Sequence, residues 1–109
     1  MKLQLIEKNI TKLQNDLDFW IKIKELWKRY EGEPLGEYPS AAYKAYLLTT
    51  GVTEAAKLLN ENGMMFGKRK FQSTDISNAI HNLEIEDTDA MNLIRALHEI
   101  QSKKMMYKT

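Results

Sequence analysis

The chain has 109 residues and a formal net charge of only +1, with 43% hydrophobic and 28% charged residues. This length allows one compact domain with one projecting element, and the composition excludes wholesale disorder. The near-neutral charge excludes binding of nucleic acid through bulk positive charge, so any such site must come from local clustering of basic residues. The absence of cysteine excludes disulfide bonds, thiolate metal sites and a cysteine nucleophile.

The sequence shows no signal for a membrane or for export. No window approaches the roughly 18 apolar residues that span a bilayer. The first residues mix charges and amides, so they lack the apolar core of a signal peptide. We therefore expect a soluble, cytoplasmic protein with no membrane partner.

The strongest helical pattern lies in residues 2 to 30. Apolar side chains recur there at alternating steps of three and four residues, which is the heptad spacing of a two-helix seam. These side chains are Leu3, Ile6, Ile10, Leu13, Leu17 and Trp20. Such a helix would be roughly 43 Å long, more than the rest of the chain can easily cover. We predict a long N-terminal helix over residues 1–30 whose apolar stripe forms a homodimer interface. The alternative is that the stripe packs on other helices of the same chain.

Toward the end of this helix the apolar pattern shifts by one step and continues as Ile23, Trp27 and Tyr30. Four aromatic side chains are predicted to form the core at this end of the helix: Phe19, Trp20, Trp27 and Tyr30. Residues 31–39 contain both prolines and two glycines, which predicts a loop.

Residues 40–109 predict a helical domain, so the whole chain is expected to be all-α, with four to five helices. Candidate N-caps mark the starts of these helices: Ser40, Thr53, Ser73 or Thr74, and Asp87 or Thr88. Residues 64–72 are too short for a helix and are interrupted by Gly67. They predict either a small β-hairpin that turns at Gly67 and Lys68 or an irregular loop.

Residues 51–83 read as a helix, a short basic turn and a second helix, which is the outline of a helix-turn-helix unit. In such units the second helix lies in the major groove and its exposed side chains contact base edges. The expected inward residues are Ile76, Ala79, Ile80 and Leu83. The opposite face carries polar side chains, at Thr74, Ser77, Asn78, His81 and Asn82.

Of these polar residues, Thr74, Ser77, Asn78 and Asn82 are predicted to contact bases, because asparagine suits the adenine edge while serine and threonine adapt to several bases. The basic residues Lys68, Arg69 and Lys70 are predicted to hold phosphates. The alternative is that this polar face and basic turn are an ordinary solvated surface.

Residues 51–83 also contain a longer pattern of residue types at fixed spacings. Its residues are Ala56, Leu58, Leu59, Asn60, Gly63, Gly67, Lys70, Phe71, Ser73, Ile76, Ile80 and Asn82. This pattern resembles the recombinase-type DNA-binding domain that follows the catalytic domain in large serine recombinases of phages and mobile elements. The chain departs from that family because it has no serine nucleophile with an arginine cluster and no catalytic domain. The resemblance therefore implies a DNA-binding module without recombinase activity, as in a small phage regulator or recombination accessory protein.

Catalytic and metal-binding patterns fail on spacing. His81 and His98 fall on different predicted helices with no ligand spacing. Ser77 lies four residues from His81, but no third residue is placed to orient the base. Asp87 and Asp89 begin a calcium-loop pattern that lacks its required glycine. We expect no enzymatic activity, no cofactor and no metal ion.

The competing interpretation is a helical protein-interaction module. A long amphipathic helix can bind a partner through its apolar face, and the apolar run at residues 64–66 adds adaptable methionines. A phage-type inhibitor of a host enzyme or defence complex would fit this description. The sequence thus predicts a homodimeric regulator that binds duplex DNA, with an interaction module that binds a host protein as the alternative.

Overall fold

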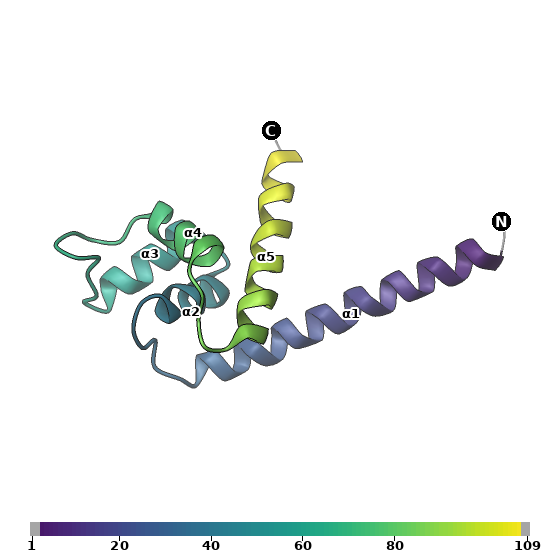
Figure 1. The fold of residues 1–109 in the computed structure, drawn as a ribbon, viewed down its shortest axis with the longest axis horizontal. Helices are drawn as coiled ribbons and strands as arrows, with labels where there is room; N and C mark the ends of the chain where they lie inside the picture. Colours follow the sequence, from purple (N-terminus) through teal and green to yellow (C-terminus); the bar gives the residue numbers. More distant parts are fainter. Residues whose placement is uncertain (1–2, 108–109) are drawn as a thin grey trace.

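The longest element is α1, a 29-residue helix that projects from a cluster of four shorter helices (Figure 1). The structure, a computed structural model, describes residues 3–107, with side chains described for residues 3–102. Its elements in chain order are α1 (Leu3–Glu31), α2 (Ser40–Thr49), α3 (Val52–Glu61), α4 (Ser73–Asn82) and α5 (Thr88–Tyr107). The predicted all-α fold class is confirmed, and no strand is present in residues 3–107.

The core is organised around α2, which contacts each of the other four helices. Six of its ten residues are buried: Ala41, Ala42, Tyr43, Ala45, Tyr46 and Leu47. The three alanines let the neighbouring helices approach closely, while the larger side chains fill the space between them. The largest fully buried side chains of the other helices are Leu59, Ile76, Ile80, Ile94 and Leu97. These residues place α3, α4 and α5 around α2.

Side chains from two other helices hold the C-terminal end of α4. The Tyr43 hydroxyl of α2 donates to the backbone carbonyls of Ile80 (3.0 Å) and Leu83 (2.6 Å). The Arg95 guanidinium of α5 donates to the same two carbonyls, at 2.6 and 3.0 Å. Carbonyls in the last turn of a helix have no intrahelical partner, so these contacts satisfy them. They also fix the orientation of α4 relative to α2 and α5.

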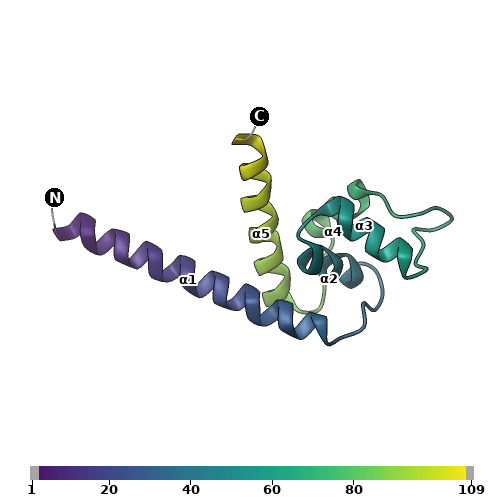
Figure 2. The same ribbon diagram turned by 180° about the vertical axis from the view of Figure 1, so that it is seen from behind.

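The N-terminal half of α1 extends away from this cluster. Every residue from Leu3 to Asp18 is exposed, and both views show no helix beside this segment (Figures 1 and 2). The radius of gyration is 16.3 Å, whereas a compact domain of about 100 residues has a radius near 13 Å. The helix meets the cluster through its C-terminal half, by the partly buried Phe19 and the buried Ile23, Leu26 and Tyr30.

Several expectations about individual residues were wrong. Trp20 and Trp27 do not belong to the core, since 42% and 37% of their surfaces are exposed. The buried stripe of α1 instead runs along the face that contains Ile23 and Leu26, and both tryptophans lie to one side of it. Leu83 is 38% exposed because it follows the last residue of α4, where the chain leaves the helix.

The helix starts also differ from the prediction. The N-cap residues of α2, α3 and α4 are Pro39, Gly51 and Gln72, each one or two residues before the predicted caps. Asp87 does cap α5, because its carboxylate accepts the backbone N–H of Ala90 at 3.1 Å.

Candidate nucleic-acid interface

The turn between α3 and α4 is tied to α3 by one asparagine. The Asn60 side chain donates to the Phe71 carbonyl (3.0 Å) and accepts the Phe71 N–H (2.8 Å). Gly63 and Gly67 have φ values of +78° and +62°, which disfavour any residue with a side chain. The family-like positions therefore have a structural explanation here, since they hold the turn in one conformation.

Aromatic packing closes the other side of this turn. The rings of Phe66 and Phe71 lie 5.6 Å apart, and Tyr38 from the loop before α2 packs on both, at 5.4 and 5.7 Å. Of the two structures predicted for residues 64–72, a hairpin or an irregular loop, the turn has only one antiparallel bridge, between Phe66 and Arg69, with backbone hydrogen bonds of 2.8 and 3.2 Å. The basic residues thus lie on a turn that these ring contacts and backbone hydrogen bonds close.

Arg69 has an intramolecular partner that the sequence did not predict. Its guanidinium forms a bidentate ion pair with Asp75, at 2.7 and 2.8 Å, and lies 4.7 Å from the centre of the Phe66 ring. The Asp75 carboxylate also accepts the backbone N–H of Gln72 at 2.8 Å, which is the acidic half of a capping box. Arg69 therefore connects the turn to the first turn of α4.

Asp75 is the one buried charged residue among the described side chains, with 5% of its surface exposed. It lies shallowly, directly beneath Arg69, whose side chain remains 46% exposed. The hydrogen bond from Arg69 is the main reason that the pKa of Asp75 lies below its ordinary value, and the Gln72 N–H lowers it further. Asp75 is therefore ionised at neutral pH, and the Arg69 guanidinium balances its charge.

Lys68 and Lys70 differ from Arg69 because both extend into solvent. Both residues are exposed, and no ion pair joins either ammonium group to another described side chain. They flank Arg69 on the turn that leads into α4. Of the three predicted phosphate contacts, these two are the positive charges that the fold leaves without an acidic partner.

Most of the polar face of α4 is exposed. Thr74, Asn78 and Asn82 are exposed, and Ser77 is half-buried. The side chains of Asn78 and Asn82 lie 3.4 Å apart, one turn from each other on the same side of the helix. The opposite side is buried through Ile76, Ala79 and Ile80, as predicted. We call Thr74, Ser77, Asn78 and Asn82 the α4 face.

His81, on the polar side of α4, meets His98 of α5. His81 Nε2 and His98 Nδ1 lie 2.9 Å apart, and the rings pack edge to face with centroids 4.5 Å apart. Burial, together with the neighbouring His81, lowers the pKa of His98. No sequence spacing indicated this contact, because the two residues come from helices whose packing angle the sequence does not specify.

The stripe predicted for dimerisation is unpaired in a single chain. Between 41% and 67% of the surface of each of its residues is exposed: Leu3, Ile6, Ile10, Leu13, Leu17 and Trp20. The intramolecular contacts of α1 use a different face, through Ile23 and Leu26. At 100° per residue the two faces are separated by roughly 140° around the helix. The cluster therefore leaves the stripe open along its length.

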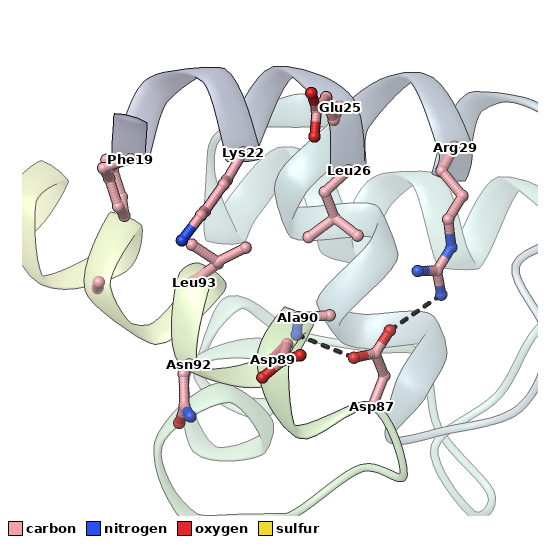
Figure 3. Close-up of a pocket in the computed structure, with 11 residues that line it drawn as sticks. Phe19, Lys22, Glu25, Leu26, Arg29, Asp87, Asp89, Ala90, Asn92 and Leu93 are labelled. Carbon is pink, nitrogen blue, oxygen red and sulfur yellow. Dashed lines mark hydrogen bonds and ion pairs between the residues drawn. The ribbon is translucent and has the colours of Figure 1, made fainter. Parts of the chain in front are cut away.

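A cleft of about 590 Å³ lies between α1 and α5 (Figure 3). Its walls combine apolar side chains such as Leu26 and Leu93 with Lys22 and Asp89. The walls bring together no set of groups with an evident chemical role, so we assign this cleft no function.

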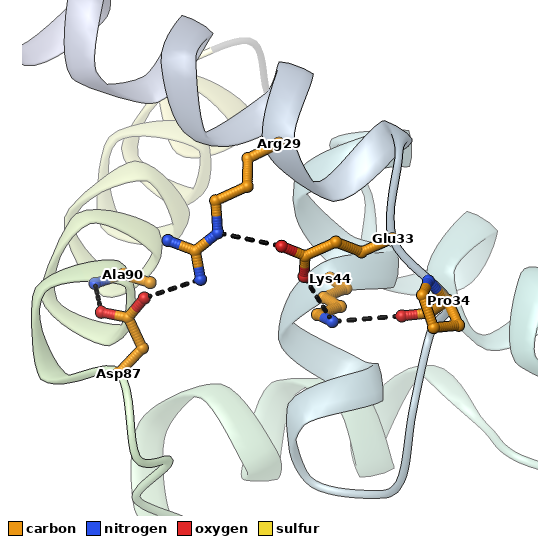
Figure 4. A network of polar contacts seen from close by, with 6 residues as sticks. All are labelled: Arg29, Glu33, Pro34, Lys44, Asp87 and Ala90. Atoms are coloured by element: carbon orange, nitrogen blue, oxygen red, sulfur yellow. Dashed lines mark hydrogen bonds and ion pairs between the residues drawn. The ribbon is translucent and has the colours of Figure 1, made fainter.

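An ion-pair network beside this cleft joins α1 to the domain (Figure 4). Arg29 contacts Asp87 at 3.0 Å and Glu33 at 3.1 Å, and Lys44 contacts Glu33 at 3.0 Å. The Ala90 N–H and, after it, Arg29 lower the pKa of Asp87. Lys44 is the main cause of the lowered pKa of Glu33. The network supports the angle at which α1 leaves the domain.

No group of three or more His, Cys, Asp or Glu side chains in the described residues could hold a metal ion. Within the same part of the chain, no helix has the length and apolar character needed to cross a bilayer.

Comparison of the chain with protein-family models, with curated proteins and with solved structures gave no match.

Proposed function

We propose that the protein is a small regulator that binds duplex DNA as a homodimer, with α4 in the major groove. The observation that carries this proposal is the α4 face, a row of uncharged polar side chains left open beside two exposed lysines. The proposed role is that of a transcriptional regulator or a recombination accessory protein, of the kind found in phages and mobile elements.

The dimensions and position of α4 suit this role. Its ten residues span about 15 Å at 1.5 Å per residue, and the major groove is about 12 Å wide. In three-helix variants of the helix-turn-helix, the third helix packs on the first two and presents its outer side to the groove. Helices α2, α3 and α4 make pairwise contacts of this kind. In this proposal Thr74, Ser77, Asn78 and Asn82 contact base edges.

The electrostatics of the turn also support DNA binding. An exposed carboxylate at the start of α4 would repel a phosphate backbone, but Asp75 is buried and paired with Arg69. Lys68 and Lys70 are then left to contact phosphates, one on each side of Arg69. In this proposal Arg69 mainly positions the turn, and its exposed edge adds positive potential toward the DNA.

The resemblance to the recombinase-type DNA-binding domain adds to this argument. Asn60, Gly63, Gly67 and Phe71 of that pattern hold the turn that carries the lysines, through hydrogen bonds and left-handed backbone positions. The resemblance therefore includes residues that hold the turn as well as residues that are proposed to contact DNA.

Binding to duplex DNA should weaken steeply as salt rises, and Lys68 and Lys70 should contribute to this slope. In a mobility-shift titration on random duplex DNA, the double variant Lys68→Ala/Lys70→Ala should bind more weakly than wild type. The slope of its log affinity against log salt should be less steep by roughly two units per copy, because each phosphate contact contributes about 0.9 to that slope.

The matched control is Lys8→Ala/Lys12→Ala, which removes the same charge from exposed positions on α1. This control should keep the wild-type slope. Absence of binding at low salt would rule out the proposed function. If both double variants lost the same DNA affinity, the turn would not be part of the DNA-binding site.

A protein-interaction role is the second candidate, and the exposed stripe of α1 favours it. Monomeric proteins rarely expose apolar surface in one continuous strip of this kind. In this alternative the stripe binds a helix of a host protein, and the α4 face is an ordinary surface.

A further inference from the structure

We infer that α1 pairs with α1 of a second copy in the antiparallel direction, about a two-fold axis that passes between Thr11 and Lys12. This inference rests on the dimer of the proposed function and adds the orientation of the two chains. Three features of the stripe and its neighbours support it.

The first feature is that the stripe complements itself when reversed. In antiparallel pairing Leu3 lies opposite Trp20 of the second copy. Ile6 then lies opposite Leu17, and Ile10 opposite Leu13. Each of the six residues then has a partner in the second copy, and the two stripes end at the same level. The large indole of Trp20 meets the smaller Leu3. Parallel pairing would instead place Trp20 against Trp20 at one layer of the seam.

The second feature is the charge that follows the stripe. Lys24 occupies the next core position of the same heptad register after Trp20, and it is exposed. In a parallel pair, two copies of Lys24 would face each other across the seam, where like charges with little hydration repel. In the antiparallel pair the stripe ends at Trp20, so Lys24 lies outside the seam.

The third feature is the set of polar residues along both edges of the stripe. Antiparallel pairing places Glu7 beside Gln14 of the second copy, and Asn9 beside Asp16. Each carboxylate then meets an amide that can donate a hydrogen bond. In parallel pairing Asp16 would lie beside Ile21, which offers no donor.

The surface available is large enough for a stable contact. The exposed parts of the stripe amount to an area on the order of 1,000 Å² across two copies, near the lower range of stable protein interfaces. Helices α2 and α5 contact a different face of α1, through Ile23 and Leu26, so they do not obstruct the second copy. The two copies of Ile23, where the domains begin, would lie about 35 Å apart.

The orientation can be measured with spin labels, because the chain has no cysteine of its own. Single variants Gln14→Cys and Lys28→Cys place a label at exposed positions outside the six-residue stripe. Gln14 lies near the proposed axis, so its labels should be within about 20 Å of each other in either orientation. The Lys28 labels should be about 50 Å apart in the antiparallel pair, from 33 residues at 1.5 Å each. In a parallel pair they should be within about 25 Å, given an interaxial distance of 8–10 Å.

A short Gln14 distance with a Lys28 distance near 50 Å would establish the inference. Short distances at both positions would overturn the orientation and leave the dimer in place. If the protein has the mass of one chain and no distance between labels is observed at either position, both this inference and the dimer of the proposed function would be overturned. DNA binding by α4 is measured separately, by the salt titration. A failure of the DNA-binding proposal can therefore be distinguished from a failure of the dimer or of its orientation.

Discussion

Replacing Leu13 with glutamate is expected to convert the proposed dimer into single chains. Leu13 lies near the middle of the α1 stripe, and 67% of its surface is exposed in the single chain. In the dimer each substituted carboxylate would have to leave water without a partner, at a cost of roughly 2–3 kcal/mol per chain. Two such costs weaken association by roughly 10³-fold or more. Light scattering at micromolar concentration should show the mass fall from two chains to one chain of 12.7 kDa.

The matched control for this variant is Asn15→Glu. It introduces the same negative charge two residues away, at an exposed position on the side of α1 away from the stripe. The control should keep the mass of a dimer, and the domain should stay folded in both variants because residues 3–18 of α1 make no core contacts. A wild-type mass of one chain would refute the seam, as would a Leu13→Glu variant that remains dimeric.

Replacing Asp75 with alanine is expected to lower the stability of the domain by about 1–2 kcal/mol. The substitution removes the capping contact to Gln72, typically worth about 1 kcal/mol, and the ion pair to Arg69, whose side chain is 46% exposed. The melting midpoint should fall by on the order of 10 °C for a domain of this size. Asp18→Ala, at an exposed position of α1, is the matched control and should shift the midpoint by only a few degrees.

The same residue predicts how stability depends on pH. Because the pKa of Asp75 is lower in the folded than in the unfolded state, its contribution is fully present above the ordinary value near 3.8. That contribution is lost as pH falls through the lower, folded-state pKa. The stability difference between wild type and Asp75→Asn should therefore be constant near neutral pH and shrink below about pH 4. A difference that grows on acidification would contradict the ion pair.

The sequence predicted where helices form, but it did not predict which surfaces pack against them. The heptad spacing of residues 3–20 predicts a helix with one apolar side, and α1 has that form. The sequence also predicted that Phe19 and Tyr30 pack against the domain, which is confirmed, but it wrongly added Trp20 and Trp27 and did not single out Leu26. Periodicity reports only that apolar residues share a face of a helix. Which surface meets that face depends on long-range packing.

The basic turn shows the same limit at the level of single residues. Lys68, Arg69 and Lys70 are equivalent in the sequence as positive charges next to a helix. The bridge between Phe66 and Arg69 directs the arginine onto Asp75 and leaves the two lysines exposed. A local pattern could not separate their roles, because the separation depends on the conformation of the turn.

Contacts between distant helices could not be predicted at all. The Tyr43 hydroxyl and the Arg95 guanidinium share the same carbonyls of α4, and His81 meets His98 across two helices. Each contact joins residues at least 15 positions apart. Such contacts follow from how α2, α4 and α5 are oriented, and that orientation comes from the buried side chains between them.

The central claim is that the turn and the outer face of α4 contact DNA, and backbone amide NMR tests it most directly. On titration with a short duplex at low salt, chemical-shift changes should concentrate in residues 68–82, which include Lys68, Lys70 and the α4 face. Residues 3–20 of α1 should remain unchanged. Changes confined to α1, or no change at any amide at low salt, would contradict the account.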